Sequence, residues 1–364
     1  TARRKGQRPS PTNLGRTLLQ LGLDGAAGKW HNGGQSTPFR RLSVSSLPFF
    51  HPIQDDLQRA EGLLQEPAPD QHPAITGAVE LLLGSGGKRL RPALVFLSAR
   101  MCGADPDVAL FAAAGVEMLH TATLVHDDLI DGSLMRRGAE TLNARWSPAA
   151  TVLTGDYLFA RAAYWVARTE NPRLVRRFAE TLMVICNGEI RQMFDGRGRV
   201  PTFQEYEQRI YAKTASLIAL SAESGAILAH ADEEAITALR VYGERLGLAF
   251  QIVDDVLDFV ADERTLGKPV GSDLRQGLVT LPVMFFLEQS GDHPALHRIL
   301  NHGSSDPMVQ EAVQAIAASP AIERSLQVAR DYIQEAKEAL QPFPSSEYRT
   351  ALLDLADFVV RRQF

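Results

Sequence analysis

Apolar and polar residues follow a helical period along most of the chain, beginning near residue 51. Hydrophobic side chains recur at i, i+3, i+4 and i+7, and clusters of glycine, proline or serine separate the segments. The period predicts helices over 54–65, 73–84, 91–101, 106–131, 150–168, 172–195, 203–228, 232–262 and 280–289. The stretch 307–364 reads as further helices, with Pro342 and Pro344 in a connecting loop. Alternating strand patterns are nearly absent, so we predict an all-α fold whose helices pack around a central space.

The first fifty residues lack this period. They are rich in Gly, Ser, Pro and Arg, and they carry eight basic side chains against one acidic one. This composition is expected of a disordered leader. It is also typical of an organellar transit peptide, which is rich in Arg and Ser and poor in acids. We therefore expect a basic leader over 1–50 without catalytic residues, and one all-α domain over 51–364.

The composition of the rest narrows the class of protein. With 45% apolar residues among 364, the chain can bury a large core. Its two cysteines, Cys102 and Cys186, form no CxxC, which favours a cytoplasmic setting, or an organellar one if the leader is a transit peptide. No apolar run approaches the roughly 18 residues of a membrane span. Beyond residue 50 the chain carries 30 basic and 42 acidic residues, a poor balance for binding nucleic acid.

Two Asp-rich segments, HDDLID at 126–131 and DDVLD at 254–258, each end a predicted helix. In each, the first and last acids lie roughly 40° apart on one helix face. Such carboxylates repel one another and oppose the helix dipole, a cost that divalent cations offset. A solvated acidic face would explain one such cluster. Both, however, lie in apolar helices where acids need partners, so two facing sets predict magnesium ions that clamp one diphosphate.

Further segments place cations near these clusters. The sequence GGKRLRP at 86–92 combines three cations with glycines that let a ligand approach the backbone. Arg136 and Arg137 follow the first Asp cluster and suit diphosphate oxygens in two-pronged contacts. Lys213-Thr214 and the loop GKPVGSD at 267–273 suggest diphosphate binding only because the Asp clusters are also present. An ordinary basic loop, structural ion pairs or surface lysines would explain each of them alone.

Taken in order, seven motifs resemble those of the trans-isoprenyl (polyprenyl) diphosphate synthases: GGKRLRP, HTATLVHDDLIDGSLMRRG, GDYLF, NGEIRQ, YAKTASL, FQIVDDVLDF and GKPVGSDLRQGLVTLP. The resemblance covers about residues 52–364. It implies an isoprenoid-synthase-type helical bundle with a central cavity, usually a homodimer. It also implies magnesium-dependent transfer of an allylic prenyl group onto isopentenyl diphosphate. One departure is Leu278, which stands where many relatives have Lys, so one auxiliary phosphate contact is in question.

The resemblance also implies roles for single residues. Asp127 and Asp131 would bind two magnesium ions and Asp254 a third, with an outer shell of Asp128, Asp255 and Asp258. The allylic diphosphate would be held by Arg136, Lys213 and Lys268, and isopentenyl diphosphate by Lys88, Arg91, His120 and Arg137. The family stabilises the developing allylic cation at the positions of Lys213, Thr214 and Gln251.

Product length is predicted from the helix before the first Asp cluster. Short-chain members of the family carry bulky aromatics four and five residues before the first Asp, where this chain has Thr123 and Ala122. Small residues at these positions leave room in the cavity for the growing prenyl chain, which predicts a long-chain, all-trans product, as in quinone side chains. Leu119, one helical turn further from the Asp cluster, is a candidate residue for limiting the length of that chain. The alternatives are that Ala122 serves only tight helix packing and that the product is shorter, as in geranylgeranyl diphosphate synthases.

Two other functions were weighed against this one. A class I terpene cyclase shares the helices and a first DDxxD, but its second motif is of the NDxxSxxxE type. A regulatory subunit of a heteromeric synthase typically loses Asp, Arg or Lys from these motifs. Here those residues are present apart from the position of Leu278.

Overall fold

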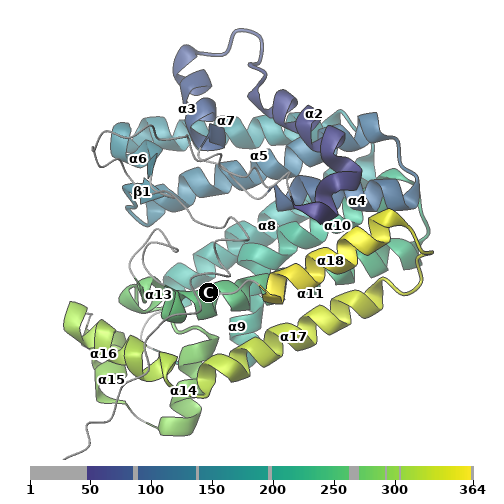
Figure 1. Cartoon of the computed structure of the whole chain (residues 1–364). Helices are drawn as coiled ribbons and strands as arrows, with labels where there is room; N and C mark the ends of the chain where they lie inside the picture. Colours follow the sequence, from purple (N-terminus) through teal and green to yellow (C-terminus); the bar gives the residue numbers. More distant parts are fainter. Residues whose placement is uncertain are drawn as a thin grey trace, which may run out of the picture.

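The computed structural model describes residues 47–84, 89–136, 139–195, 199–261, 270–291, 293–302 and 305–361, and these are almost entirely helical (Figure 1). The first part contains η2 (Pro48–Ile53), α2 (Gln54–Gln65), α3 (Pro73–Gly84), α4 (Leu90–Cys102), α5 (Pro106–Ile130), β1 (Met135–Arg136), β2 (Ala139–Glu140), α6 (Leu142–Arg145) and α7 (Pro148–Ala167). The middle part contains α8 (Pro172–Asp195), α9 (Phe203–Ile210), η3 (Tyr211–Ala215), α10 (Ser216–Leu228) and α11 (Glu233–Val260). The last part contains α13 (Ser272–Arg275), α14 (Leu281–Ser290), α15 (Pro294–His302), α16 (Asp306–Ala317), α17 (Ala321–Ala339) and α18 (Glu347–Arg361).

The predicted all-α fold is confirmed, and the expected helices lie within a few residues of their predicted bounds. The segment predicted as one helix over 203–228 differs, because the five residues of η3 form a π-helix between α9 and α10. The helical period also gave no sign of the short antiparallel hairpin β1–β2, in which Arg136 pairs with Ala139.

Local sequence explains where several helices begin. Asp105 precedes Pro106, the first residue of α5, and its side chain accepts a hydrogen bond from the Asp107 backbone amide at 2.8 Å. Thr202 and Glu205 form a reciprocal capping box at the start of α9. These caps satisfy backbone amides that have no partner within the helix.

The helices pack in a continuous series through one core. The closest neighbours along the series are α7, α5, α4, α10, α11 and α17. Figure 1 shows α5 and α7 on one side of the molecule, α11 and α17 on the other, and α14 to α16 gathered at one end. Because α5 and α11 both lie in this series, the fold fixes the two Asp-rich helix ends relative to each other.

Helix α5 is long and apolar enough to cross a membrane by length and composition alone, a property that the sequence pattern had not indicated. In the fold, however, 67% of its most apolar window is buried against other helices. That burial is what a core helix shows, since its apolar faces are already covered by protein.

The packed part of the chain already includes residues just before the expected boundary at 51. The 3-10 helix η2 begins at Pro48, and Phe50 is buried at 1% exposure. Residues of η2 contact α18, α4 and α2. The start of the fold is therefore held by the C-terminal helix.

Candidate active site

The first Asp cluster occupies the C-terminal end of α5. Asp131 caps the helix, and its backbone amide donates to the Asp127 carbonyl at 2.8 Å. The Asp127 side chain is half-buried and that of Asp131 is exposed. Burial raises the pKa of Asp127 to about 6, Glu189 and Asp131 add to the rise, and Lys213 and Arg136 oppose it. The two cations thus only partly offset the burial of the Asp127 carboxylate.

Asp128 of the same cluster ties the following hairpin back onto α5. It is buried at 4% exposure, and its Oδ1 accepts a hydrogen bond from Arg136 Nε at 2.7 Å. Burial raises the pKa of Asp128, and the guanidinium of Arg136 opposes the rise. Arg136 on strand β1 thus lies beside the predicted metal-binding aspartates, and its hydrogen bond to Asp128 fixes its guanidinium there.

Lys213 reaches the first Asp cluster from the π-helix η3. Its Nζ lies 3.4 Å from Oε1 of Glu189 on α8, and Glu189, Asp127 and Asp131 all raise its pKa although burial opposes them. A π-helix is uncommon and is frequently found at functional sites. Of the sequence-predicted residues, the structure thus brings Lys213 together with Asp127, Asp131 and Arg136.

The neighbouring Thr214 connects η3 to the second Asp cluster on α11. Its hydroxyl donates to Gln251 Oε1 at 2.6 Å, and Gln251 Nε2 donates to Asp255 Oδ1 at 2.9 Å. The second Asp255 oxygen accepts from the buried Tyr206 hydroxyl at 2.8 Å. Burial raises the pKa of Asp255, as does Asp273, while Gln251 and Tyr206 oppose the rise. This chain of hydrogen bonds fixes the side-chain amide of Gln251.

The other two aspartates of the second cluster differ in exposure. Asp258 is buried at 1%, and its Oδ2 accepts from the Asp273 backbone amide at 3.1 Å. Its backbone carbonyl accepts from the Gly271 amide at 2.8 Å. Asp258 thereby anchors the start of α13, whereas Asp254 keeps a half-buried side chain at the end of α11.

The predicted isopentenyl diphosphate residues are only partly described. Arg91 and His120 are half-buried, on α4 and α5, and the segments that contain Lys88, Arg137 and Lys268 lie outside the described residues. Arg89 adopts a left-handed backbone conformation with φ of 44° just before α4. Its Nη1 lies 2.9 Å from Oε1 of the buried Glu117 on α5, which fixes the entry to α4.

The three residues predicted to determine product length lie on α5, before the first Asp cluster. Leu119 and Ala122 are fully buried at 0% exposure. Thr123 is half-buried, and its hydroxyl donates to the His120 carbonyl at 2.8 Å. Ala122 thus packs against its neighbours about one helical turn before Asp127, whereas the surroundings of Thr123 are only partly filled.

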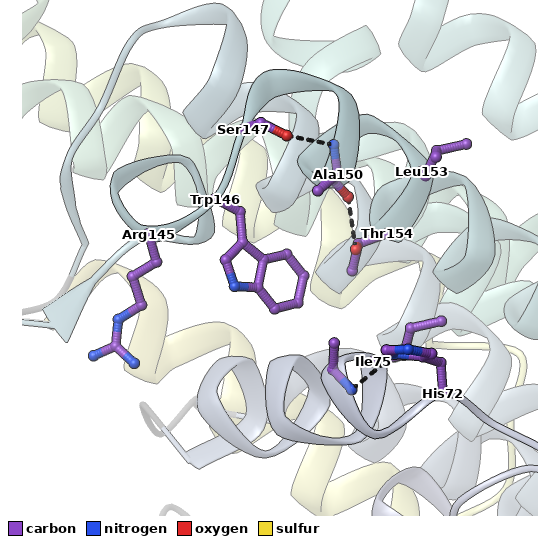
Figure 2. A pocket seen from close by; sticks show the side chains of 9 residues that line it. His72, Ile75, Arg145, Trp146, Ser147, Ala150, Leu153 and Thr154 are labelled. Carbon is purple, nitrogen blue, oxygen red and sulfur yellow. Dashed lines mark hydrogen bonds between the residues drawn. The ribbon is translucent and has the colours of Figure 1, made fainter.

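A pocket of about 510 Å³ lies between the start of α3 and the α6–α7 connection. Figure 2 shows the Trp146 ring pointing into it, opposite Ile75 and beside Thr154. None of the sequence-predicted site residues lines this pocket.

Three contacts at the site were not predicted from sequence. Glu189 pairs with Lys213, the Tyr206 hydroxyl bonds to Asp255, and the His126 ring packs over Gly155, where a Cβ would lie 2.1 Å from Nε2. The motifs NGEIRQ and GDYLF contain Glu189 and Gly155, so the signal was present without an assigned role. Each contact joins helices far apart in the chain, which a local period does not reveal.

The fold and this pair of acidic helix ends with a nearby lysine define the class of all-α isoprenoid synthases. Residues 72–316 match the family described as polyprenyl synthetase. Heptaprenyl diphosphate synthase component 2 of Bacillus subtilis is 36% identical over 315 residues, covering 86% of this chain and 89% of the relative. Solanesyl-diphosphate synthase 2 of Oryza sativa is 36% identical and covers 88% of this chain and 80% of its own.

A solved structure gives the same result. The polyprenyl synthase of Caulobacter crescentus, complexed with calcium and isoprenyl diphosphate, superposes with a TM-score of 0.82 at 38% identity, over 86% of this chain and 97% of its own. This chain belongs to the polyprenyl synthetase family and is a prenyltransferase.

Proposed function

We propose that this chain condenses isopentenyl diphosphate with allylic diphosphates, head to tail, to make a long-chain all-trans polyprenyl diphosphate. The observation that carries the proposal is the meeting of Asp127, Asp131 and Lys213 from α5 and η3. Carboxylates beside a lysine provide both metal ligands and a cation for one diphosphate. Relatives named heptaprenyl, solanesyl and octaprenyl diphosphate synthases support a long product.

The residues present fit magnesium. Burial raises the pKa of Asp127 although Lys213 and Arg136 oppose the rise, so a divalent cation beside this carboxylate would stabilise its ionised form. Within the described residues, no group of three His, Cys, Asp or Glu side chains could hold a metal by itself. Magnesium is usually held by one or two carboxylates together with phosphate oxygens and water. We propose that Asp127 and Asp131 hold two ions and Asp254 a third, each completed by the allylic diphosphate.

The reaction breaks the allylic C–O bond, and its electron pair leaves with the diphosphate. When bound, magnesium withdraws electrons from that diphosphate as a Lewis acid. Lys213 and Arg136 take up part of the negative charge that develops on it. The Thr214 hydroxyl donates its hydrogen to Gln251, so its oxygen lone pairs remain to stabilise the allylic cation.

The isopentenyl double bond then attacks the allylic carbon, which forms the new C–C bond, and a proton leaves the resulting cation. We propose that the departed diphosphate accepts this proton, since none of the site side chains is an evident general base. Apolar residues of α5 above Asp127 exclude water that would quench the cation.

The metal assignment is tested by Asp127→Ala, assayed with radiolabelled isopentenyl diphosphate and farnesyl or geranylgeranyl diphosphate. Loss of an electrostatic contact made mainly in the transition state should lower kcat by roughly 10²–10³-fold. The exposed Asp354 on α18 provides the control Asp354→Asn, which should keep full activity. Near-native condensation by the Asp127 variant would contradict the assignment.

We also propose that the chain assembles as a homodimer through α7 and α8, which contact each other. Large apolar side chains are exposed on these two helices: Val152, Leu153, Tyr164, Val175, Met183, Ile190, Met193 and Phe194. An exposed apolar surface of this kind marks an interface. Because some relatives are named component 2 of a synthase, activity of the purified chain alone distinguishes self-association from the need for another component.

A further inference from the structure

Glu189 lies beside the proposed diphosphate site without a role in the mechanism above. It belongs to α8, and its Oε1 is 3.4 Å from Lys213 Nζ. The Glu189 side chain is 19% exposed and that of Lys213 is 42% exposed, so water screens the pair only partly. Lys213 thus has three carboxylates around it, those of Glu189, Asp127 and Asp131, and it makes its ion pair with Glu189.

Helix α8 can lie this close to η3 because the residue before Glu189 is a glycine, Gly188. A Cβ on Gly188 would lie 2.5 Å from the Cβ of Ala212, a distance that real Cβ atoms do not tolerate. The two segments therefore touch at Gly188 and Ala212, and the next residue of each, Glu189 and Lys213, forms the ion pair. Any larger residue at 188 must push α8 away from η3.

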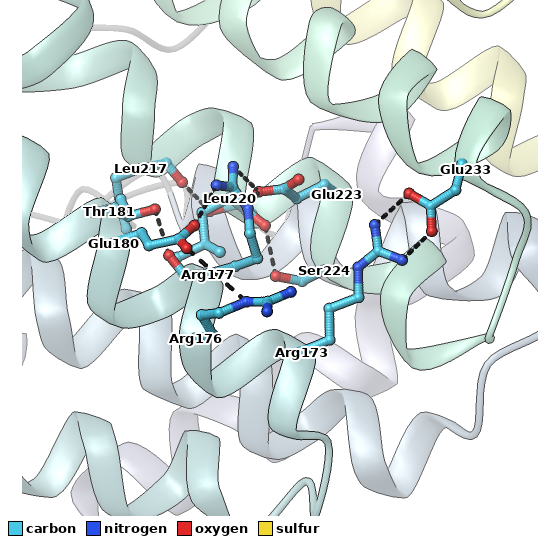
Figure 3. A network of polar contacts seen from close by, with 11 residues as sticks. Arg173, Arg176, Arg177, Glu180, Thr181, Leu217, Leu220, Glu223, Ser224 and Glu233 are labelled. Atoms are coloured by element: carbon cyan, nitrogen blue, oxygen red, sulfur yellow. Dashed lines mark hydrogen bonds and ion pairs between the residues drawn. The ribbon is translucent and has the colours of Figure 1, made fainter.

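Helix α8 is also fixed along its length by ion pairs near its start. Arg177 Nη2 lies 2.9 Å from Oε1 of Glu223, which is buried on α10. Arg173 donates to Glu233 at the start of α11, with Nη2 2.6 Å from Oε2, and Figure 3 shows both pairs. These contacts join the first half of α8 to α10 and to the start of α11.

We propose that Glu189 is a positioning residue that holds the Lys213 ammonium on the α8 side of the site, away from direct pairing with Asp127. Asp127 and Asp131 then stay available to metal ions, and the Lys213 ammonium faces the place of the allylic diphosphate. Without Glu189, the nearest anionic partners of Lys213 are the two aspartates, and the lysine competes with the metal for them. The inference rests on the function proposed above.

The test is Glu189→Gln, which removes the charge and keeps the shape. Binding of magnesium with inorganic diphosphate is measured by isothermal titration calorimetry, beside kcat and the KM for the allylic substrate. We expect affinity for the magnesium–diphosphate pair to fall about tenfold, and KM to rise more than kcat falls. Loss of a negative charge near an anionic ligand would by itself tighten binding, so unchanged or tighter binding overturns the proposal.

A second arm shows whether Glu189 acts through Lys213. In a Lys213→Met background, Glu189→Gln should change the calorimetric affinity less than twofold, because the lysine to be positioned is gone. An equal tenfold loss in that background would instead make Glu189 a ligand of the metal and overturn the proposal. Glu189→Asp, which keeps the charge, should restore at least part of the lost affinity.

Two more variants separate positioning from folding. Gly188→Ala should weaken binding in the same direction as Glu189→Gln, because it moves α8 from η3. Glu180→Gln, on the same helix but paired with Arg177, should leave binding and kinetics unchanged. If the wild-type chain binds magnesium and diphosphate but makes no prenyl product, the proposed function fails while the calorimetric comparison still decides the role of Glu189.

Discussion

At the scale of single residues, Asp127 combines a functional charge with a cost to the fold. Burial raises its pKa in the folded protein to about 6, above the ordinary value of 3.8, so folding shifts this carboxyl toward its protonated form. The ionised carboxylate therefore destabilises the metal-free fold at neutral pH, and this cost decreases as the pH falls through about 6 and is absent below the ordinary pKa of 3.8.

Asp127→Asn should accordingly raise the stability of the metal-free protein at pH 7.5, by roughly 1–3 kcal/mol. Chemical denaturation in the presence of a chelator measures this difference. At pH 4 the two proteins should unfold at nearly the same denaturant concentration, because the wild-type carboxyl is then largely neutral. A variant less stable than wild type at pH 7.5 would contradict the prediction.

The same titration gives the expected pH dependence of metal use. Protonation of Asp127 removes a metal ligand, so the magnesium concentration for half-maximal activity should rise as the pH falls from 8 through about 6. The measurement is a magnesium titration of the initial rate at each pH. Asp354→Asn, a change at an exposed position of α18, should follow the wild-type curve.

At the scale of elements, α5 joins the metal cluster to the residues expected to limit product length. Replacing Ala122 by Phe should shorten the main product by several isoprene units, because a buried aromatic one turn above Asp127 would block the growing chain. Mass spectrometry of products from a fixed primer gives the length, and Ala122→Ser should leave it unchanged.

Because Ala122 is fully buried, overpacking at this position can cost about 1–3 kcal/mol of stability. Thr123→Phe offers a second variant, since Thr123 is only half-buried and has more room for the ring. Long products from both folded variants would show that Ala122 serves helix packing alone.

The elements also show what the sequence could and could not reveal. Helices such as α5 and α11 follow a clear apolar period, and their bounds were predictable within a few residues. The break at η3 was not, because Tyr211–Ala215 continues the same apolar pattern as its neighbours while packing sets its hydrogen bonds.

Some residues of the candidate site were likewise predictable from the sequence, whereas their contacts were not. The Asp clusters, Lys213 and Gln251 stand out by chemistry and order in the sequence. The pairing of Lys213 with Glu189 and that of Asp255 with Tyr206 depend on how helices cross. A motif can contain such a residue, as NGEIRQ contains Glu189, but no local pattern shows which residue it contacts.

At the scale of the whole molecule, η2 connects the first described residues to the last helix. Phe50 and Ile53 are each 1% exposed, and η2 packs on α18. Removing residues 1–46 should leave the midpoint of thermal unfolding unchanged, whereas Phe50→Ala should cost roughly 3–5 kcal/mol. Calorimetry of the two variants checks both results. A truncated chain that unfolds at a much lower temperature would show that the leader packs on the domain.

Assembly is a second property of the whole molecule. Phe194 is 84% exposed on α8, so Phe194→Glu should shift the species in light scattering from dimer to monomer. The exposed Gln310 on α16 provides a matched change, Gln310→Glu, that should keep the dimer. A wild-type chain that is monomeric at micromolar concentration would refute the proposed interface.

The π-helix η3 constrains the number of codons in this part of the chain as well as their identity. A turn closed by i→i+5 hydrogen bonds holds one residue more than a turn of α-helix, so loss of one residue from Tyr211–Ala215 would give regular α-helix with α9 and α10 nearly in their present orientation. The remaining side chains of the segment would then point in other directions, and Lys213 and Thr214 could not both keep their partners Glu189 and Gln251. In a library of single-codon deletions, a loss within this segment should therefore leave a folded chain that has lost its prenyltransferase activity.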